Sequence, residues 1–347
     1  MRKTFLAALF IGLCTVLNAQ NVNYYTPGVG EGVLYFLPKT LLQIDVVATK
    51  KVYTPGQLAP FAKEYLKTTV EKEATTTWEL KDIQIQTIGI PDTTKVYIIR
   101  LKDKNLASNV DLTHNGIIKA INTTGQEFSM PQYTLQKSAP IENPKHYLTE
   151  EILLAGSPRK MAELTAKEIY AIRESRNNIL RGNAETMPKD GASLQIIMDN
   201  LEKQEKALTQ LFVGTEEWEE TKSTYIITPD MEKEVVAFRF SKYWGAGEAT
   251  DLSGEPYFLT IQPSLNMPTA PIEEGKRKRP EGIIYNIPGE AIVRLTKENK
   301  VVYEQKHSFT QIGATEVLVE KLFDKKVNTR VQFHPATGAI LKIEKNE

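Results

Sequence analysis

The spacing of apolar residues changes twice along this chain of 347 residues, and this change constrains the fold more than any other feature. Between residues 158 and 213, apolar side chains recur at steps of three and four, which is the pattern of amphipathic helices. Before and after that stretch, apolar and polar residues alternate, as in residues 83–88, which is typical of half-buried strands. The sequence therefore predicts an α+β fold, with two mainly antiparallel β modules separated by a long antiparallel helical hairpin.

The helical stretch divides into two helices, over residues 158–181 and 191–213, with a short polar link between them. Ser157 is a typical N-cap residue, and a glycine follows the end of each helix. Because the link is short and both helices are amphipathic, we expect them to pack antiparallel, with Ile172 and Leu201 in the shared seam.

The β regions contain one predicted short helix and two predicted turns. Residues 83–88 and 96–99 flank the turn-like segment 91–94, so they are predicted to form a β-hairpin. A proline opens the predicted short helix over 60–68, where it suits the first turn. A turn is also expected over 334–338, between the last two strands.

The two β regions share a signature, because residues 32–38 (GVLYFLP) resemble residues 282–288 (GIIYNIP). Either the β modules are a duplication, or two β-hairpins share these residues by coincidence, and both interpretations stay open. The predicted organisation is a signal peptide over 1–19, an N-terminal β-rich module with one short helix over 20–145, the helical hairpin over 146–220 and a C-terminal β-rich module over 221–347.

The N-terminus has the order of a secretory signal peptide, with basic residues, an apolar run over 5–17 and a small residue before the expected cleavage. The run is shorter than the about 20 apolar residues of a membrane-spanning helix. Cleavage before Gln20 removes Cys14, the only cysteine, so disulfides and thiol catalysis are excluded in the mature chain. The alternative is a lipoprotein anchored at Cys14, but Leu13 stands where the processing peptidase needs a small residue. We expect an exported protein, periplasmic or associated with the outer membrane.

The charge and hydropathy of the sequence limit the classes of binding partner that we expect. The 43 basic and 43 acidic residues balance, and the sequence shows no strongly basic face or domain of the kind that binds nucleic acid. No later apolar run has the length of a transmembrane helix. We therefore expect a partner in the cell envelope, either an unknown protein or a glycan, and neither nucleic acid nor a transmembrane segment in the mature chain.

The sequence carries few signs of chemistry. Its four histidines, His114, His146, His307 and His334, show no metal-ligand spacing, and motifs for a catalytic nucleophile, a phosphate loop or a dinucleotide are missing from it. We predict no catalytic residues, no metal and no cofactor, and we interpret the carboxylates over 216–220 as a solvated face. Carboxylates on separate strands can still form a glycosidase site without any sequence motif.

Two polar features are candidate sites. Arg173, Glu174 and Arg176 lie on one helix flank, where they would either contact a neighbouring element through ion pairs or bind an anionic ligand. The segment Asp92-Thr93-Thr94 resembles the O-glycosylation acceptor of secreted Bacteroidetes proteins, which makes Thr93 a candidate for modification. The alternative is that the segment is a plain turn.

Several segments carry a family resemblance: residues 32–38, 53–56, 171–176, 182–191, 211–215, 253–256 and 335–338. They resemble domain-of-unknown-function family 4831, which comprises secreted proteins of Bacteroidetes, and the resemblance covers essentially the whole mature chain. It implies export and a cell-envelope setting. The family carries no known activity, so it provides no functional residues to transfer.

Two functions are compatible with these observations. The first is a non-enzymatic exported envelope protein that binds a partner or stabilises an assembly. The alternative is a periplasmic hydrolase acting on glycans, with two carboxylates brought to about 5–10 Å by the fold. The lack of a nucleophile or metal motif in the sequence favours the first.

Overall fold

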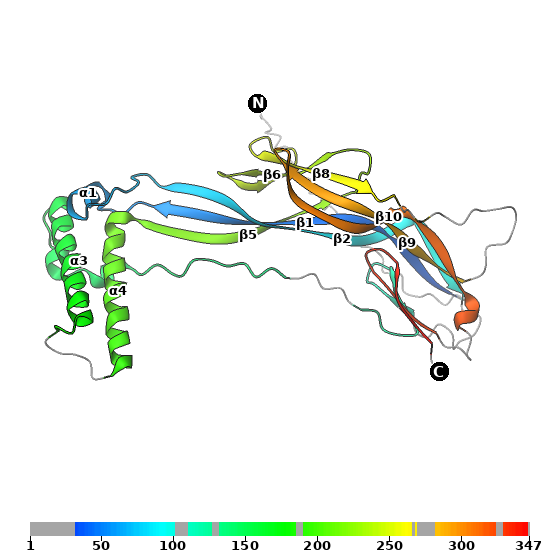
Figure 1. The fold of residues 1–347 in the computed structure, drawn as a ribbon, viewed down its shortest axis with the longest axis horizontal. Coiled ribbons are helices and arrows are strands. Elements are labelled where there is room, and N and C mark those ends of the chain that lie inside the picture. Colours follow the sequence, from blue (N-terminus) through cyan, green and yellow to red (C-terminus); the bar gives the residue numbers. More distant parts are fainter. Residues whose placement is uncertain are drawn as a thin grey trace, which may run out of the picture.

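The computed structural model describes residues 32–100, 110–126, 132–184, 190–265, 268, 282–323 and 329–345. The predicted signal peptide and Cys14 lie outside these residues. The described chain is mixed α+β with more strand than helix, which confirms the broad fold class (Figure 1).

The strands are β1 (Gly32–Thr54), β2 (Thr75–Arg100), β3 (Val110–Leu112), β4 (Ile118–Ile121), β5 (Thr215–Ile227), β6 (Val235–Ser241), β7 (Gly245–Gly247), β8 (Glu255–Pro263), β9 (Gly282–Lys297), β10 (Lys300–Val319), β11 (Arg330–Phe333) and β12 (Ile340–Glu344). The α-helices are α1 (Ala62–Tyr65), α2 (Glu150–Leu153), α3 (Pro158–Leu180) and α4 (Gly191–Val213). The 3-10 helices are η1 (Ala59–Phe61), η2 (Pro144–Tyr147) and η3 (Glu320–Phe323).

A long ribbon of three strands in the order β2-β1-β5 runs along the molecule (Figure 1). The hairpin predicted over residues 83–99 is wrong, because both halves belong to the single strand β2 and pair with β1. Four residues of β2, 92–95, bulge out opposite the single residue Leu37. The turn-forming residues of this segment therefore make a bulge, since β1 is long enough to pair with the chain on both sides of it.

A second sheet has the order β10-β9-β8-β6-β7 and packs face to face on the ribbon. Its hairpin β9–β10 carries a similar irregularity, with residues 310–313 of β10 opposite the single residue Pro288. The inner faces of the two sheets bury one apolar core, in which Leu42 and Ile44 of β1 pack with Phe238 of β6 and Val293 of β9. The two predicted β-rich modules therefore share a core in the folded chain.

A third, small sheet in the order β12-β11-β4-β3 also draws strands from both halves of the sequence. Its core contains Tyr35 from β1, Ile118 from β4 and Phe333 from β11. The Tyr35 hydroxyl donates to the carbonyl of Ile284 at 3.0 Å and accepts from the Ile284 N–H at 2.9 Å. These contacts fix the β1 and β9 strands against each other at the end of the molecule farthest from the helices.

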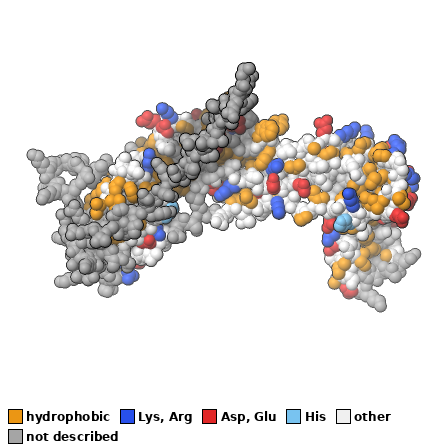
Figure 2. Space-filling model, turned by 180° about the vertical axis from the view of Figure 1, so that it is seen from behind, with side chains coloured by type: hydrophobic (Ala, Val, Ile, Leu, Met, Phe, Trp, Pro, Cys, Tyr) orange, Lys and Arg blue, Asp and Glu red, His pale blue; other side chains and the backbone are white. Residues whose placement is uncertain are grey.

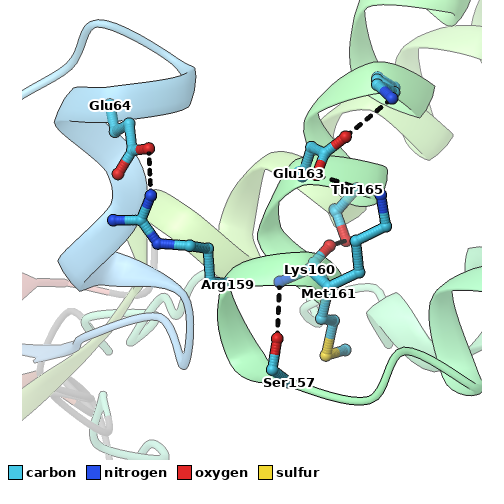
Figure 3. Close-up of polar contacts among 8 residues, drawn as sticks. Glu64, Ser157, Arg159, Lys160, Met161, Glu163 and Thr165 are labelled. Atoms are coloured by element: carbon cyan, nitrogen blue, oxygen red, sulfur yellow. Dashed lines mark hydrogen bonds and ion pairs between the residues drawn. The ribbon is translucent and has the colours of Figure 1, made fainter.

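The helices gather at the opposite end of the ribbon (Figure 1). The bounds of α3 and α4 agree with the predicted ranges to within one residue. Ser157 caps α3 by accepting from the Lys160 N–H at 3.2 Å, and Arg159 binds Glu64 of α1 at 2.9 Å (Figure 3). The Tyr53 hydroxyl at the end of the ribbon donates to the Val213 carbonyl at the end of α4 at 2.9 Å.

Ile172 and Leu201 belong to one apolar cluster, as expected, but the long helical hairpin is not clearly supported along its whole length. Ile172 is buried, but Leu201 is only partly buried. The buried residues of α4 all lie in its last two turns, next to the ribbon: Ala207, Leu208, Leu211 and Phe212. Farther from the ribbon, Ile196 is 62% exposed, so the apolar stripe of α4 faces solvent there.

The surface of the elongated molecule mixes the two signs of charge, and acidic and basic side chains alternate along the ribbon (Figure 2). Orange apolar side chains gather at the helical end in the same view. Within the described residues, we find no helix with the length and apolar content to cross a bilayer.

Candidate functional site

A cavity of about 450 Å³ lies where the ribbon, the second sheet and the small sheet meet. It is lined by residues of β2, of the turn between β3 and β4, of β10 and of the turn between β11 and β12. These residues are Ile85, Gln86, Thr87, Ile88, Gly89, Thr113, His114, Asn115, Ile117, His307, His334, Pro335 and Ala336. The volume lies in the range that holds small organic ligands.

The turn over 334–338 forms one wall, and neighbouring strands fix it in place. The Thr40 hydroxyl donates to the Ala336 carbonyl at 3.2 Å, and the Asn286 side-chain amide donates to the Thr337 carbonyl at 3.0 Å. Gly89 of β2 lies so close to this turn that a Cβ atom there would stand 2.3 Å from the Pro335 carbonyl oxygen. The glycine is therefore what allows β2 and the turn to meet.

The turn over 113–117 forms a second wall and is attached to β1. The Ile117 N–H donates to the Thr113 hydroxyl at 3.0 Å, and the Phe36 N–H donates to the Gly116 carbonyl at 2.9 Å. Gly116 has a φ of +81°, a left-handed conformation that glycine adopts without a steric penalty. Both walls are thus held by hydrogen bonds before any ligand arrives.

His334 has a defined orientation in the first wall. Its Nδ1 accepts from the Ala336 N–H at 3.1 Å, so the neutral ring carries its proton on Nε2. Burial lowers the pKa of His334 below its ordinary value of 6.5. The ring is therefore neutral at pH 7.

His307 of β10 lies in the third wall beside Tyr303. The His307 Nε2 and the Tyr303 hydroxyl are 2.7 Å apart, and the hydroxyl also lies 3.3 Å from the Ile85 carbonyl. Burial lowers the pKa of His307 and raises the pKa of Tyr303 to about 12. Both groups are uncharged at neutral pH, so the hydrogen bond between them places no charge in this wall of the cavity.

The lining contains no Asp, Glu, Lys or Arg among the described residues. Although three of its residues are histidines, no group of three metal-ligating side chains comes together anywhere in the described ranges. The pair of facing carboxylates that a glycan hydrolase would need is likewise missing from this lining. The arrangement can bind a ligand through hydrogen bonds and apolar contacts.

The predicted polar cluster lies elsewhere, between the helices. Arg173 Nε and Arg176 Nη1 of α3 each approach Glu205 of α4 to 2.6 Å, one at each carboxylate oxygen. Arg173 also lies over the Tyr170 ring, 5.5 Å from its centre. Glu174 is exposed and does not join the two arginines at Glu205.

Thr93 lies exposed in the bulge of β2. Asp92 organises this bulge, because its carboxylate accepts from the Thr94 N–H at 3.0 Å and from the Thr94 hydroxyl at 2.6 Å. The Thr93 side chain is therefore presented on a fixed piece of backbone.

The interpretation of residues 216–220 as a solvated face is wrong for Glu220, whose side chain is fully buried. Glu220 lies on β5, forms an ion pair with Lys81 of β2 and accepts from the Gln136 N–H at 3.0 Å. The hydrogen bond from Lys81 lowers the pKa of Glu220. The sequence could not show this pairing, because it depends on the register of two strands that are distant in the chain.

The sequence analysis named His114, His307 and His334, but it did not predict that they line one cavity. His114 and His334 both fall in turn-forming segments, T-H-N-G and H-P-A-T-G, and a histidine in such a turn is the only local signal. These histidines come together because three sheets meet at the cavity, and the sequence pattern did not predict that arrangement.

Neither curated proteins nor solved structures give a match. A family model described as a domain of unknown function, DUF4831, matches residues 31–341, which is nearly the whole chain. The chain therefore belongs to the DUF4831 family.

Proposed function

We propose that this chain is an exported cell-envelope protein without enzymatic activity, and that it binds a small ligand in the histidine-lined cavity. The observation that carries the proposal is the cavity itself, about 450 Å³ in volume, at the junction of three sheets. Its walls are held in place by hydrogen bonds from β1 and β9, so little ordering is needed when a ligand binds.

Export to the periplasm or to the outer membrane follows from the basic, apolar and small-residue order of positions 1–19. A chain isolated from the envelope of its native host should begin at Gln20, which mass spectrometry of the intact protein measures. A mature chain that begins at a lipid-modified Cys14 would replace this proposal with the lipoprotein alternative.

Three finer features of the organisation support a binding or assembly role. The ion pairs from Arg173 and Arg176 to Glu205 favour an antiparallel helical hairpin as a unit, with the exposed apolar side chains Leu180 and Ile196 available to an envelope partner. The two antiparallel strand pairs β1–β2 and β9–β10 share a bulge of four residues opposite one, which supports a duplication. Thr93, exposed in its bulge, is a candidate for O-glycosylation after export.

Native mass spectrometry of the protein purified from the host envelope tests the binding function. We expect an additional non-covalent mass on the native chain, and its loss in Asn115→Trp, because the indole would occupy the cavity mouth. Lys203→Trp places the same side chain on the exposed face of α4 and should keep the bound mass. Equal bound mass in both variants, or none in the native chain, would remove the cavity as the functional site.

A further inference from the structure

We infer that the ligand of the histidine-lined cavity is a small molecule without net charge that combines hydroxyl groups with an apolar face, as neutral sugars do. This inference rests on the proposed binding function and adds the chemical class of the ligand. It follows from three properties of the lining, which are its charge, its hydrogen-bonding groups and its apolar surface.

The first property is the lack of charge. The described lining residues include no carboxylate, ammonium or guanidinium group, and its titratable side chains are three histidines. A charged ligand placed there would lose part of its hydration without gaining an opposite charge, which is unfavourable. His307 and His334 are uncharged at neutral pH, which agrees with a preference of the cavity for uncharged ligands.

The second property is a set of groups that can both donate and accept hydrogen bonds. Thr87, Thr113 and Asn115 contribute hydroxyl and amide groups, and His307 and His334 contribute neutral imidazoles. A hydroxyl group on a ligand also donates and accepts, so it matches the mixed donor and acceptor character of this lining. Carboxylates only accept and ammonium groups only donate, so they would leave part of this set unpaired.

The third property is an apolar surface beside those groups. Ile85 and Ile117 are buried residues that also line the cavity, and Pro335 and Ala336 extend the apolar surface into the turn. A ligand made only of polar groups would leave this surface without a partner. A pyranose ring has C–H groups on its faces and hydroxyls at its edge, and it therefore matches both parts of the lining.

The test measures the binding of three probes that are similar in size and differ in charge: methyl glucoside, glucuronate and the cationic polyol N-methylglucamine. Ligand-observed NMR of the purified protein at pH 7.5 gives their dissociation constants. We expect methyl glucoside to bind at least ten-fold more tightly than either charged probe. The affinity should fall at least ten-fold in Asn115→Trp and stay unchanged in Lys203→Trp.

A second variant tests the charge argument directly. Asn115 is exposed at the cavity mouth, so Asn115→Lys adds a cation to the lining without disturbing the core. Glucuronate should then gain at least ten-fold in affinity, whereas methyl glucoside should not.

The outcomes separate the ligand class from the binding function. If a charged probe binds native protein as tightly as methyl glucoside and Asn115→Trp abolishes this binding, the inferred class is wrong while the cavity remains a binding site. Failure of methyl glucoside to bind, or binding that Asn115→Trp leaves unchanged, also overturns the class. The proposed binding function fails if no bound mass that depends on the cavity is found on the protein from its host.

Discussion

At the scale of single residues, Gly89 decides whether the cavity wall can close. A Cβ atom at this position would lie 2.3 Å from the Pro335 carbonyl oxygen and 2.7 Å from the Ala336 Cα, and both atoms belong to the backbone. We expect Gly89→Ala to lower the free energy of unfolding by about 1–3 kcal/mol, because β2 and the turn must move apart. Gly156→Ala is the matched control, since nothing lies within 4 Å of its added Cβ. Urea denaturation compares the two variants, and equal stabilities would contradict the close approach.

The cavity histidines also predict a dependence of stability on pH. Burial lowers the pKa of His307 and His334, so the unfolded chain binds protons at a higher pH than the folded chain does. The free energy of unfolding should therefore fall as the pH is lowered from above 6.5 through the depressed values. Protonation of His334 also removes the acceptor for the Ala336 N–H.

We expect the double variant His307→Gln, His334→Asn to show a flatter stability profile between about pH 7.5 and 5, because neither amide titrates there. His146→Asn is the control, since His146 is exposed and lies outside the cavity. Chemical denaturation at a series of pH values measures the profile. If the double variant loses as much stability on acidification as the native chain, then other titratable groups cause the pH dependence of the free energy of unfolding.

At the scale of elements, α4 consists of a buried half and an exposed half. Leu208 has no exposed surface, whereas Ile196 is 62% exposed. Leu208→Ala should cost about 2–5 kcal/mol of stability through the cavity it leaves in the helical core. Ile196→Ala should cost less than about 0.5 kcal/mol. Thermal and urea unfolding of both variants measure this, and a similar cost for the two would mean that the outer half of α4 is packed as well.

The elements that the sequence predicts well are those whose first and last residues are determined by neighbouring residues in the chain. The cap at Ser157 and the positive φ of Gly214 fix the start of α3 and the end of α4, so their bounds were predictable. The segment 91–94 was misjudged because a bulge and a turn use the same residue types, and only the length of β1 decides between them. The cavity could not be predicted, because its walls come from strand pairings distant in sequence.

At the scale of the whole molecule, the ribbon sets the shape. β1 has 23 residues, which correspond to about 75 Å at about 3.3 Å per residue. A compact chain of 347 residues would have a radius of gyration of about 20 Å. We expect small-angle X-ray scattering of the monomer to give a clearly larger value, with a distance distribution skewed toward long distances. A radius near 20 Å would mean that the helical end folds back onto the β-sheets in solution.

The same strand has a mechanical consequence. β1 starts in the body formed by the three sheets and ends at the helices, and it pairs antiparallel with β2 along its length and with β5 from Leu42 onward. Its interstrand hydrogen bonds lie perpendicular to the strand direction. When the two ends of the molecule are pulled apart, these bonds are loaded in shear and share the force, whereas bonds unzipped from one end would break in turn. The ribbon is therefore suited to transmit tension between whatever holds its two ends.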